Sequence, residues 1–305
     1  MTESASAHPR ESLPLDSTAQ LLSRITAQLG TQLSHVSLNG TRRFMHPPAQ
    51  PAPGAAPALV AVAHGSRDPR ALRTVVKLLD RVRELRPGLD VRLGHIELNE
   101  PLLPDTLAGL GTGEAVLVPL LLGRGHHVKR DIPAAAAAVP ALRTTVAAPL
   151  GPHPLLVEAL HGRLVKAGWP AGETDVRGAA VVLAAAGSRD PDSACDTRRT
   201  ARMLSERLGG VPVVPAYASA TTPTVPVAVR ALAARGSHRI AVASYFTAPG
   251  RFATAAAAAA PWIAAPPLGA HPAMARLLLH RYDRAVADAL PAHEAVMNGH
   301  LLASA

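Results

Sequence analysis

The chain has 305 residues, a length typical of two domains of ordinary size, each of which can bury its own core. Its formal net charge of +9 predicts attraction to anionic partners, but nucleic acid is disfavoured because the arginines are scattered along helical patterns without interleaved aromatic residues. The single cysteine, Cys195, excludes an intramolecular disulfide and a multi-cysteine metal site, and no uncharged apolar run approaches the length of a membrane span.

The N-terminal segment differs in composition from the rest of the chain. Residues 18–37 carry leucine and isoleucine at the spacing of an amphipathic helix, and residues 46–57 form a linker rich in proline and alanine. We interpret residues 1–57 as a largely disordered extension that contains at most one short helix. Its polar start lacks the apolar segment of a signal peptide, so we expect the protein in the cytoplasm.

From residue 58 onward, apolar strand patterns alternate with helical patterns. Residues 58–63 predict a buried strand, and Asp68 followed by Pro69 predicts the start of a helix with Asp68 as its N-cap. Further strands are predicted over 91–98, 115–122 and 144–148, with helices over 101–110, from Asp131 onward and over 153–167. Strands that are apolar on both faces and alternate with helices indicate a parallel sheet covered by helices on both sides.

The second half of the chain repeats this plan. The stretch GSRDP follows an apolar strand pattern at 65–69 and again at 187–191, and PLGPHP returns later as PLGAHP. A steady shift of about 120 residues across several elements indicates an internal duplication. We therefore predict an α/β fold with two tandem, duplicated three-layer domains and mainly parallel sheets. The expected bounds are 58–172 for the first domain, 173–290 for the second and 291–305 for a tail.

Polar side chains fall at three predicted strand ends of the first half. His64 ends the first strand, Glu97 lies near the end of the second, and His126 and His127 follow the third. Ligands of open α/β sheets bind at the carboxyl ends of the strands. Two imidazoles and a carboxylate suit a divalent cation such as Fe²⁺, Co²⁺, Ni²⁺ or Zn²⁺, and a neutral imidazole also accepts protons.

These residues also have structural interpretations. A lone histidine after a strand is more often a hydrogen-bonded turn residue than a ligand, and His95 belongs either to the core or to a site on one strand face with Glu97. His153 and His271 precede the last helix of each half, so we interpret them as structural. Cys195 lies in a predicted helix and is expected to pack rather than to act as a nucleophile.

The duplication supplies an internal control for the candidate ligands. The second half keeps GSRDP, which points to helix capping, but it replaces the candidates as a set: His64 by Ala186, His95 by Tyr217, Glu97 by Ser219, His126 by Arg251 and His127 by Phe252. Scattered structural histidines are not expected to disappear together. This pattern indicates one site, carried by the first domain alone.

The succession HGSRDP, HIELNEP and VPLLLGRGHHVKRDIP resembles the sirohydrochlorin chelatases, the class II chelatases of siroheme and cobalamin biosynthesis. The resemblance covers residues 58–290 and is to the long, two-domain bacterial form. It implies insertion of a divalent metal into sirohydrochlorin, with Fe²⁺ favoured and Co²⁺ as the other candidate. It also implies that His64 and His127 handle the metal, that His126 is at a variable motif position, and that Glu97 is the acidic residue of the middle motif.

Sirohydrochlorin bears eight carboxylates, which gives the positive charge of the chain a role. Four basic residues flank the motifs and are predicted to bind these carboxylates together with His126, with a solvated surface as the alternative for each: Arg67, Arg124, Lys129 and Arg130. The metal is a substrate, and no organic cofactor, nucleic acid or membrane partner is expected. A duplicated chain can build both walls of a cleft by itself, so we expect a monomer.

Two other classes of function remain open at the level of the sequence. A carrier of tetrapyrrole or metal would use the same pocket without turnover. A hydrolase or transferase using Ser66 is disfavoured, because the chain has no G-x-S-x-G motif and the second half retains the serine as Ser188.

Overall fold

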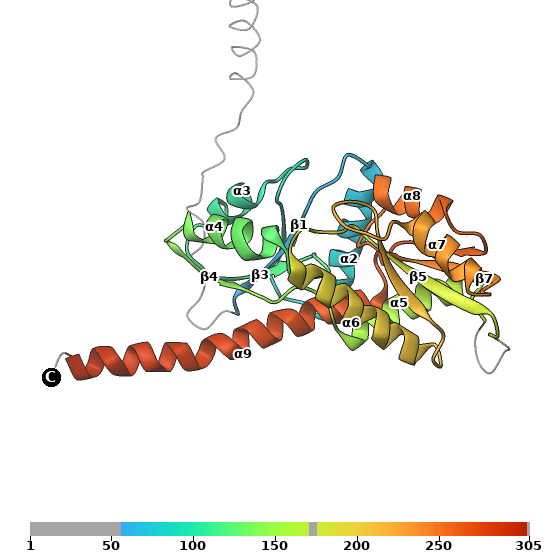
Figure 1. Cartoon of the computed structure of the whole chain (residues 1–305). Coiled ribbons are helices and arrows are strands. Elements are labelled where there is room, and N and C mark those ends of the chain that lie inside the picture. The colour runs from blue at the N-terminus through green and yellow to red at the C-terminus, as the bar shows by residue number, and fades with distance from the viewer. Residues whose placement is uncertain (1–55, 171–175, 304–305) are drawn as a thin grey trace, which may run out of the picture. The chain divides into compact units, whose positions relative to one another are not determined.

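The computed structural model describes residues 56–170 and 176–303, with side chains as far as residue 289 (Figure 1). The predicted extension over 1–57 and its helix lie outside the described residues, apart from Ala56 and Pro57. The predicted boundary at 172–173 lies outside them as well. No helix in the described part of the chain is both long and apolar enough to cross a membrane.

The first half forms a parallel sheet of four strands in the order β2-β1-β3-β4. Its elements are β1 (Ala58–Ala63), α2 (Pro69–Leu85), β2 (Val91–His95), α3 (Leu103–Ala108), β3 (Gly113–Pro119), the π-helical turn η1 (His127–Asp131), α4 (Ile132–Ala137), β4 (Leu142–Val146) and α5 (Pro154–Lys166). Every residue of β1 is buried, because this strand is central and helices cover both faces of the sheet.

The second half repeats this topology with the strand order β6-β5-β7-β8. Its elements are β5 (Ala179–Ala185), α6 (Pro191–Arg207), β6 (Val213–Tyr217), α7 (Val225–Ala234), β7 (Arg239–Tyr245), α8 (Arg251–Ala258), β8 (Ile263–Ala264) and α9 (Pro272–Ala303). The predicted fold class of tandem, duplicated three-layer α/β units is confirmed. The last helix also runs through much of the predicted tail.

The two halves exchange their last helices. Helix α9, the last of the second half, packs against α2, β3 and β4, whereas α5, the last of the first half, packs against α6 and β7. Figure 1 shows α3 and α4 on one side of β3 and β4 and α9 on the other. One apolar core therefore runs through both halves and includes Leu59, Leu160, Leu183, Leu204 and Leu278. Two separate clusters fill the outer faces, under α3 and α4 and under α7 and α8.

Side chains cap the N-termini of helices α2, α5 and α9. The Asp68 carboxylate accepts a hydrogen bond from the backbone N of Arg70 at 2.9 Å, as the sequence predicts for an N-cap. His153 caps α5 in the same way, with Nδ1 accepting from the backbone N of Leu155 at 3.1 Å. His271 does so for α9 through Ala273 N at 3.2 Å, so the structural interpretation of both histidines is confirmed.

Three local predictions are wrong. The strand predicted over 91–98 ends at His95, because the chain turns away at Leu98, whose φ is +68°. The helical segment predicted from Asp131 starts earlier, with the π-helical turn from His127. Cys195 is exposed on α6, so it does not pack into the core.

Candidate functional site

The carboxyl ends of the strands of both sheets border one large cavity. Its volume is about 1270 Å³, and it is lined by residues 63–68, 97–99 and 120–128 of the first half and by 185–188 and 245–253 of the second. The strand-end loops of the two halves thus face each other across a common space. A cavity of this size at strand ends is where an α/β fold binds a ligand.

The turn after β1 places His64 at this cavity. Gly65 has a φ of +102°, and a Cβ at this residue would collide with the carbonyl oxygen of Glu97. A glycine is therefore required for the close approach of the two loops, and Gly187 meets Ser219 in the same way in the second half. This backbone contact explains why GSRDP persists in the half that lacks the histidines.

His64 lies between two other predicted site residues. Its ring centroid is 4.8 Å from that of His127, with the ring planes nearly perpendicular at 89°. Its Nδ1 is 3.6 Å from the nearer carboxylate oxygen of Glu97, and both of these side chains are about half exposed. The structure thus brings together the imidazole of the first motif, the carboxylate of the second and the imidazole of the third.

Asp131 orients the ring of His127. Its Oδ2 lies 2.6 Å from Nδ1 of His127, one helical turn away in η1. A carboxylate that accepts from Nδ1–H selects the tautomer in which Nε2 carries the lone pair. Nε2 of His127 is thereby the nitrogen free to bind a metal or accept a proton. From the sequence, Asp131 was predicted only as the start of a helix. Its spacing of four residues from His127 in a helical turn was the signal for this pair.

His126 and His95 differ from the other two histidines. The side chain of His126 is 75% exposed, and its Nε2 is 3.5 Å from the other oxygen of Asp131. His95 is buried, with Nδ1 3.2 Å from the carbonyl oxygen of Pro101, and burial lowers its pKa although this hydrogen bond opposes the shift. His95 is thus buried although it borders the cavity, and it does not share a strand face with the exposed Glu97, which lies beyond the end of β2.

The three predicted metal ligands do not form a closed cage. Within the part of the chain that the structure describes, no group of three or more His, Cys, Asp or Glu side chains is arranged to hold a metal ion. His64 instead contacts His127 on one side and Glu97 on the other. Such an open arrangement differs from a structural metal site, in which protein ligands fill the whole coordination shell.

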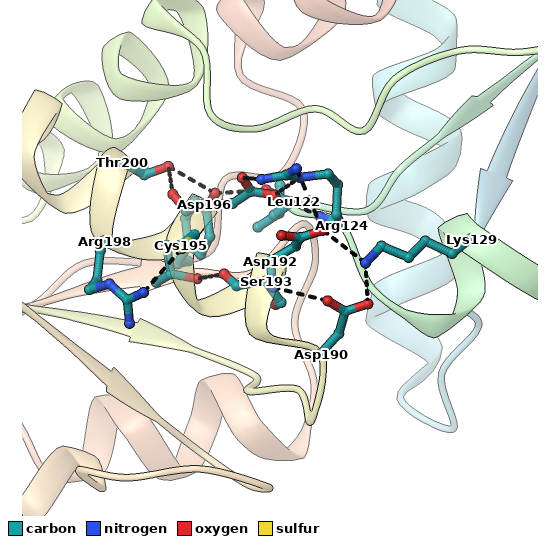
Figure 2. Close-up of polar contacts among 12 residues, drawn as sticks. Leu122, Arg124, Lys129, Asp190, Asp192, Ser193, Cys195, Asp196, Arg198 and Thr200 are labelled. Atoms are coloured by element: carbon teal, nitrogen blue, oxygen red, sulfur yellow. Dashed lines mark hydrogen bonds and ion pairs between the residues drawn. The ribbon is translucent and has the colours of Figure 1, made fainter.

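The basic residues predicted to bind substrate carboxylates divide into two groups. Arg67 is exposed and lines the cavity, and Arg130 is exposed next to Lys129 in η1. Arg124 and Lys129 instead contact carboxylates of α6 (Figure 2). The sequence could not distinguish these two groups, because the carboxylates that engage Arg124 and Lys129 lie more than sixty residues away along the chain.

A family model and several curated proteins match the chain. The CbiX model matches residues 58–167 and 180–285. The sirohydrochlorin ferrochelatase of Bacillus subtilis is 29% identical over 173 residues, which are 54% of this chain and 64% of the relative. The sirohydrochlorin cobaltochelatase of Methanococcus aeolicus is 38% identical over 79 residues, 25% of this chain and 55% of the relative. The chain thus spans less than two thirds of the length of these relatives.

Solved structures share the fold. SirB from Bacillus subtilis with Fe³⁺ superposes with a TM-score of 0.61 at 23% identity, covering 77% of this chain and 98% of that one. A CbiX described as the terminal enzyme for siroheme biosynthesis in denitrifying bacteria superposes with a TM-score of 0.56 at 23% identity, covering 73% of this chain and 98% of that one. These likenesses agree with the two-sheet architecture described above.

Proposed function

The chain belongs to the CbiX family, and on this premise we propose that it inserts a divalent metal into sirohydrochlorin. One observation supports this proposal above the others. His64 and His127, from separate motifs, lie with ring centroids 4.8 Å apart at a cavity of about 1270 Å³. Two imidazoles beside a large cavity suit the transfer of a metal to a large, flat ligand.

The site residues have complementary roles in the proposed reaction. Two pyrrole N–H protons leave sirohydrochlorin as the dication enters, so the charge balances. A neutral imidazole of His64 or His127 binds the metal briefly and accepts a proton. The carboxylate of Glu97, 3.6 Å from Nδ1 of His64, stabilises the imidazolium that forms. Asp131 stabilises a positive charge on His127 in the same way.

The open ligand set is suited to release. A metal-inserting enzyme has to bind the ion weakly enough to pass it on. His64, His127 and Glu97 leave coordination positions for the pyrrole nitrogens, whereas a closed cysteine site would retain the ion. We assign these three residues as the metal-handling and catalytic set, with Arg67, Arg130 and His126 as the remaining candidates for binding the substrate carboxylates.

Fe²⁺ is the metal we favour, with siroheme as the product, and Co²⁺ is the alternative. Imidazole and carboxylate ligands accept both ions. The relatives include a ferrochelatase and a cobaltochelatase. Initial rates of insertion at equal concentrations of Fe²⁺ and Co²⁺ decide between them, and a higher rate with Co²⁺ would contradict the preference for iron.

A measurement of turnover distinguishes an enzyme from a carrier, which binds its ligand without converting it. The apo-protein is mixed anaerobically with sirohydrochlorin and Fe²⁺ or Co²⁺, and the absorption change of the tetrapyrrole is followed. We expect a catalysed rate that is proportional to protein concentration, with more than one product molecule per chain. A rate no faster than that without protein, together with binding of sirohydrochlorin, would support a carrier instead.

We also propose that the protein acts as a monomer. Both walls of the cavity come from one chain, because the second half supplies residues 185–188 and 245–253 opposite the first-half motifs. A single chain therefore completes the cavity without a partner subunit. Sedimentation at working concentrations tests this expectation, and a stable dimer would contradict it.

A further inference from the structure

An ion pair joins the loop after β3 to helix α6 of the second half (Figure 2). The guanidinium of Arg124 donates to both carboxylate oxygens of Asp196, at 2.7 Å and 3.0 Å. The backbone N of Arg124 also donates to Asp196, at 2.9 Å. One carboxylate of the second half therefore holds both the side chain and the main chain of the loop, two residues before His126.

A second contact holds the other end of the same segment. Lys129, two residues after His127, places its ammonium 2.6 Å from Asp190 and 2.9 Å from Asp192 (Figure 2). Asp190 caps α6 through the backbone N of Asp192, so its carboxylate belongs to a rigid helix start. The residues between Arg124 and Lys129, including the exposed His126 and the partly buried His127, are thus anchored on each side to α6.

The environment of the Asp196 carboxylate allows it to hold Arg124 in one position. Its side chain is only 5% exposed. Burial by itself raises the pKa of Asp196, but the hydrogen bonds from the guanidinium and backbone N of Arg124 outweigh this effect and lower it. The carboxylate is therefore charged and fully engaged. The bidentate pairing of Arg124 with Asp196 is directional. Only the carboxylate of Asp196 is buried, and the side chain of Arg124 is 46% exposed, so solvent screens this pair less than one in which both groups are exposed.

The loop has little else to determine the position of Arg124. Glycines flank this residue on both sides, at 123 and 125, and glycine leaves the backbone free to adopt many conformations. Another anchor between the halves is the Tyr245 hydroxyl, which donates to the carbonyl oxygen of Leu122 at 2.8 Å. Inside the segment, the backbone N of Lys129 donates to the carbonyl oxygen of Gly125, and Asp131 holds the ring of His127. The ion pairs with α6 add the restraint that ties this locally ordered segment to the second half.

Neither the basic residues of this cluster nor the aspartates within α6 are repeated at the equivalent positions of the other half. In the duplication, Asp192 and Asp196 correspond to Arg70 and Thr74, and Arg124 and Lys129 correspond to Pro249 and Thr254. In the first half the capping carboxylate Asp68 is paired with Arg70 of its own helix, at 2.7 Å. In the second half an aspartate replaces that arginine, so the capping carboxylate is free to engage Lys129.

We propose that the three carboxylates of α6, those of Asp190, Asp192 and Asp196, are positioning residues that hold His127 in the geometry for metal transfer. The second half lacks the metal-handling histidines, but it carries the charges that place the loop of the first half. Asp196 acts on the reaction through Arg124 and does not itself touch the metal. The effect on catalysis rests on the proposed function; the effect on the loop does not.

The test compares the pair of Arg124 and Asp196 with another arginine–aspartate pair that also joins the two halves. The variants are Arg124→Gln, Asp196→Asn and their double. The matched controls are Arg86→Gln and Asp283→Asn, which break the pair between α2 and α9, also across the two halves but outside the cavity lining. Each variant is measured by hydrogen exchange of backbone amides over 123–131, by Co²⁺ binding, by insertion kcat and KM, and by melting temperature.

We expect Arg124→Gln and Asp196→Asn each to raise hydrogen exchange over 123–131 about tenfold or more and to lower kcat/KM by about 10–100-fold. The double variant should be no worse than the more impaired single, because both remove one interaction. Asp196→Glu, which keeps the charge, should recover part of kcat/KM. The two controls should leave both quantities within about twofold of wild type.

Several outcomes would overturn the proposal. Unchanged hydrogen exchange over 123–131 in both single variants would show that the ion pair does not place the loop. A fall in kcat/KM that merely follows the melting temperature, in cluster and control variants alike, would show a purely structural role. If Asp196→Asn does not fold, Arg124→Gln and Lys129→Gln, which alter exposed side chains, decide the question by the same criteria. A wild type without insertion activity refutes the proposed function, and the exchange data still decide on the loop.

Discussion

The imidazole of His64 is half exposed at the end of β1, and the other half of the chain has alanine at the equivalent position. Replacing His64 with Ala therefore copies a turn that this fold already accommodates, and the free energy of unfolding should change by no more than about 1 kcal/mol. Metal insertion should fall at least about 100-fold, because His127 loses its neighbouring ligand and proton acceptor.

Turnover and melting temperature are measured together for His64→Ala. The control is Ala186→His in the same background, which should restore nothing, because Ser219 and Phe252 provide no further ligands beside the new imidazole. Turnover near that of wild type, or a loss that parallels a lower melting temperature, would mean that His64 is only a turn residue.

His153 makes the stability of the protein depend on pH. Burial, together with the smaller effects of the nearby Arg281 and His280, lowers the pKa of His153 to about 4. The unfolded chain binds a proton near pH 6.5, whereas the folded chain does not until about pH 4. The stabilisation that neutral His153 contributes is therefore fully present above about pH 6.5 and is lost as the pH falls toward 4. Because solvent screens this partly exposed ring, the loss is on the order of 1–2 kcal/mol.

The comparison variant for this prediction is His153→Asn. Asparagine retains a side-chain acceptor for the backbone N of Leu155 but does not titrate. Urea unfolding of both proteins at several pH values between 4 and 7 measures the difference. Parallel stability curves over this range would contradict a role for His153 in the pH dependence.

Each copy of GSRDP contains the N-cap of a helix, Asp68 for α2 and Asp190 for α6. Asp68→Ala removes the side-chain acceptor at the N-cap of α2, and the melting temperature should fall by about 2–4 °C. Asp68→Asn keeps an acceptor and should lie close to wild type. Thermal unfolding followed by circular dichroism measures both. An equal loss in the two variants would assign the effect to the ion pair with Arg70 rather than to the cap.

The stability of both halves depends on the exchanged helices α5 and α9. Leu278 of α9 is fully buried in the core cluster that extends through both halves. Leu278→Ala should lower the free energy of unfolding by about 2–5 kcal/mol. Because α9 packs on α2, β3 and β4, we expect the loss to affect the first half as much as the second.

Hydrogen exchange at β1 and β5 measures the response of the two halves to Leu278→Ala separately. Amides of both strands should exchange through one common unfolding event, with the same increase in rate. An increase confined to β5 would contradict the view that the two sheets share one cooperative core.

Local features of the structure were largely predictable. The strand over 58–63, the N-cap at Asp68 and a structural role for His153 and His271 follow from patterns that span a few residues, whereas the structure shows that these two histidines cap helices. The pairing of His64 with His127 was predicted because carboxyl ends of parallel strands meet at one sheet edge, and the repeat showed which residues belong together. The orientation of His127 by Asp131 was missed, since the helical segment was expected to start only at Asp131.

Patterns in the sequence were enough to predict the parallel α/β architecture and its duplication, which the structure confirms, and they predict a site whose histidines all lie in the first half. These properties are recorded in periodicity, in caps and in differences between two copies of one pattern. Two features could be seen only in the folded chain: the halves exchange α5 and α9, and Arg124 and Lys129 form ion pairs with carboxylates at the start of α6. The physical reason is distance along the chain: an apolar helix face or a cation does not specify its partner until packing brings one within reach.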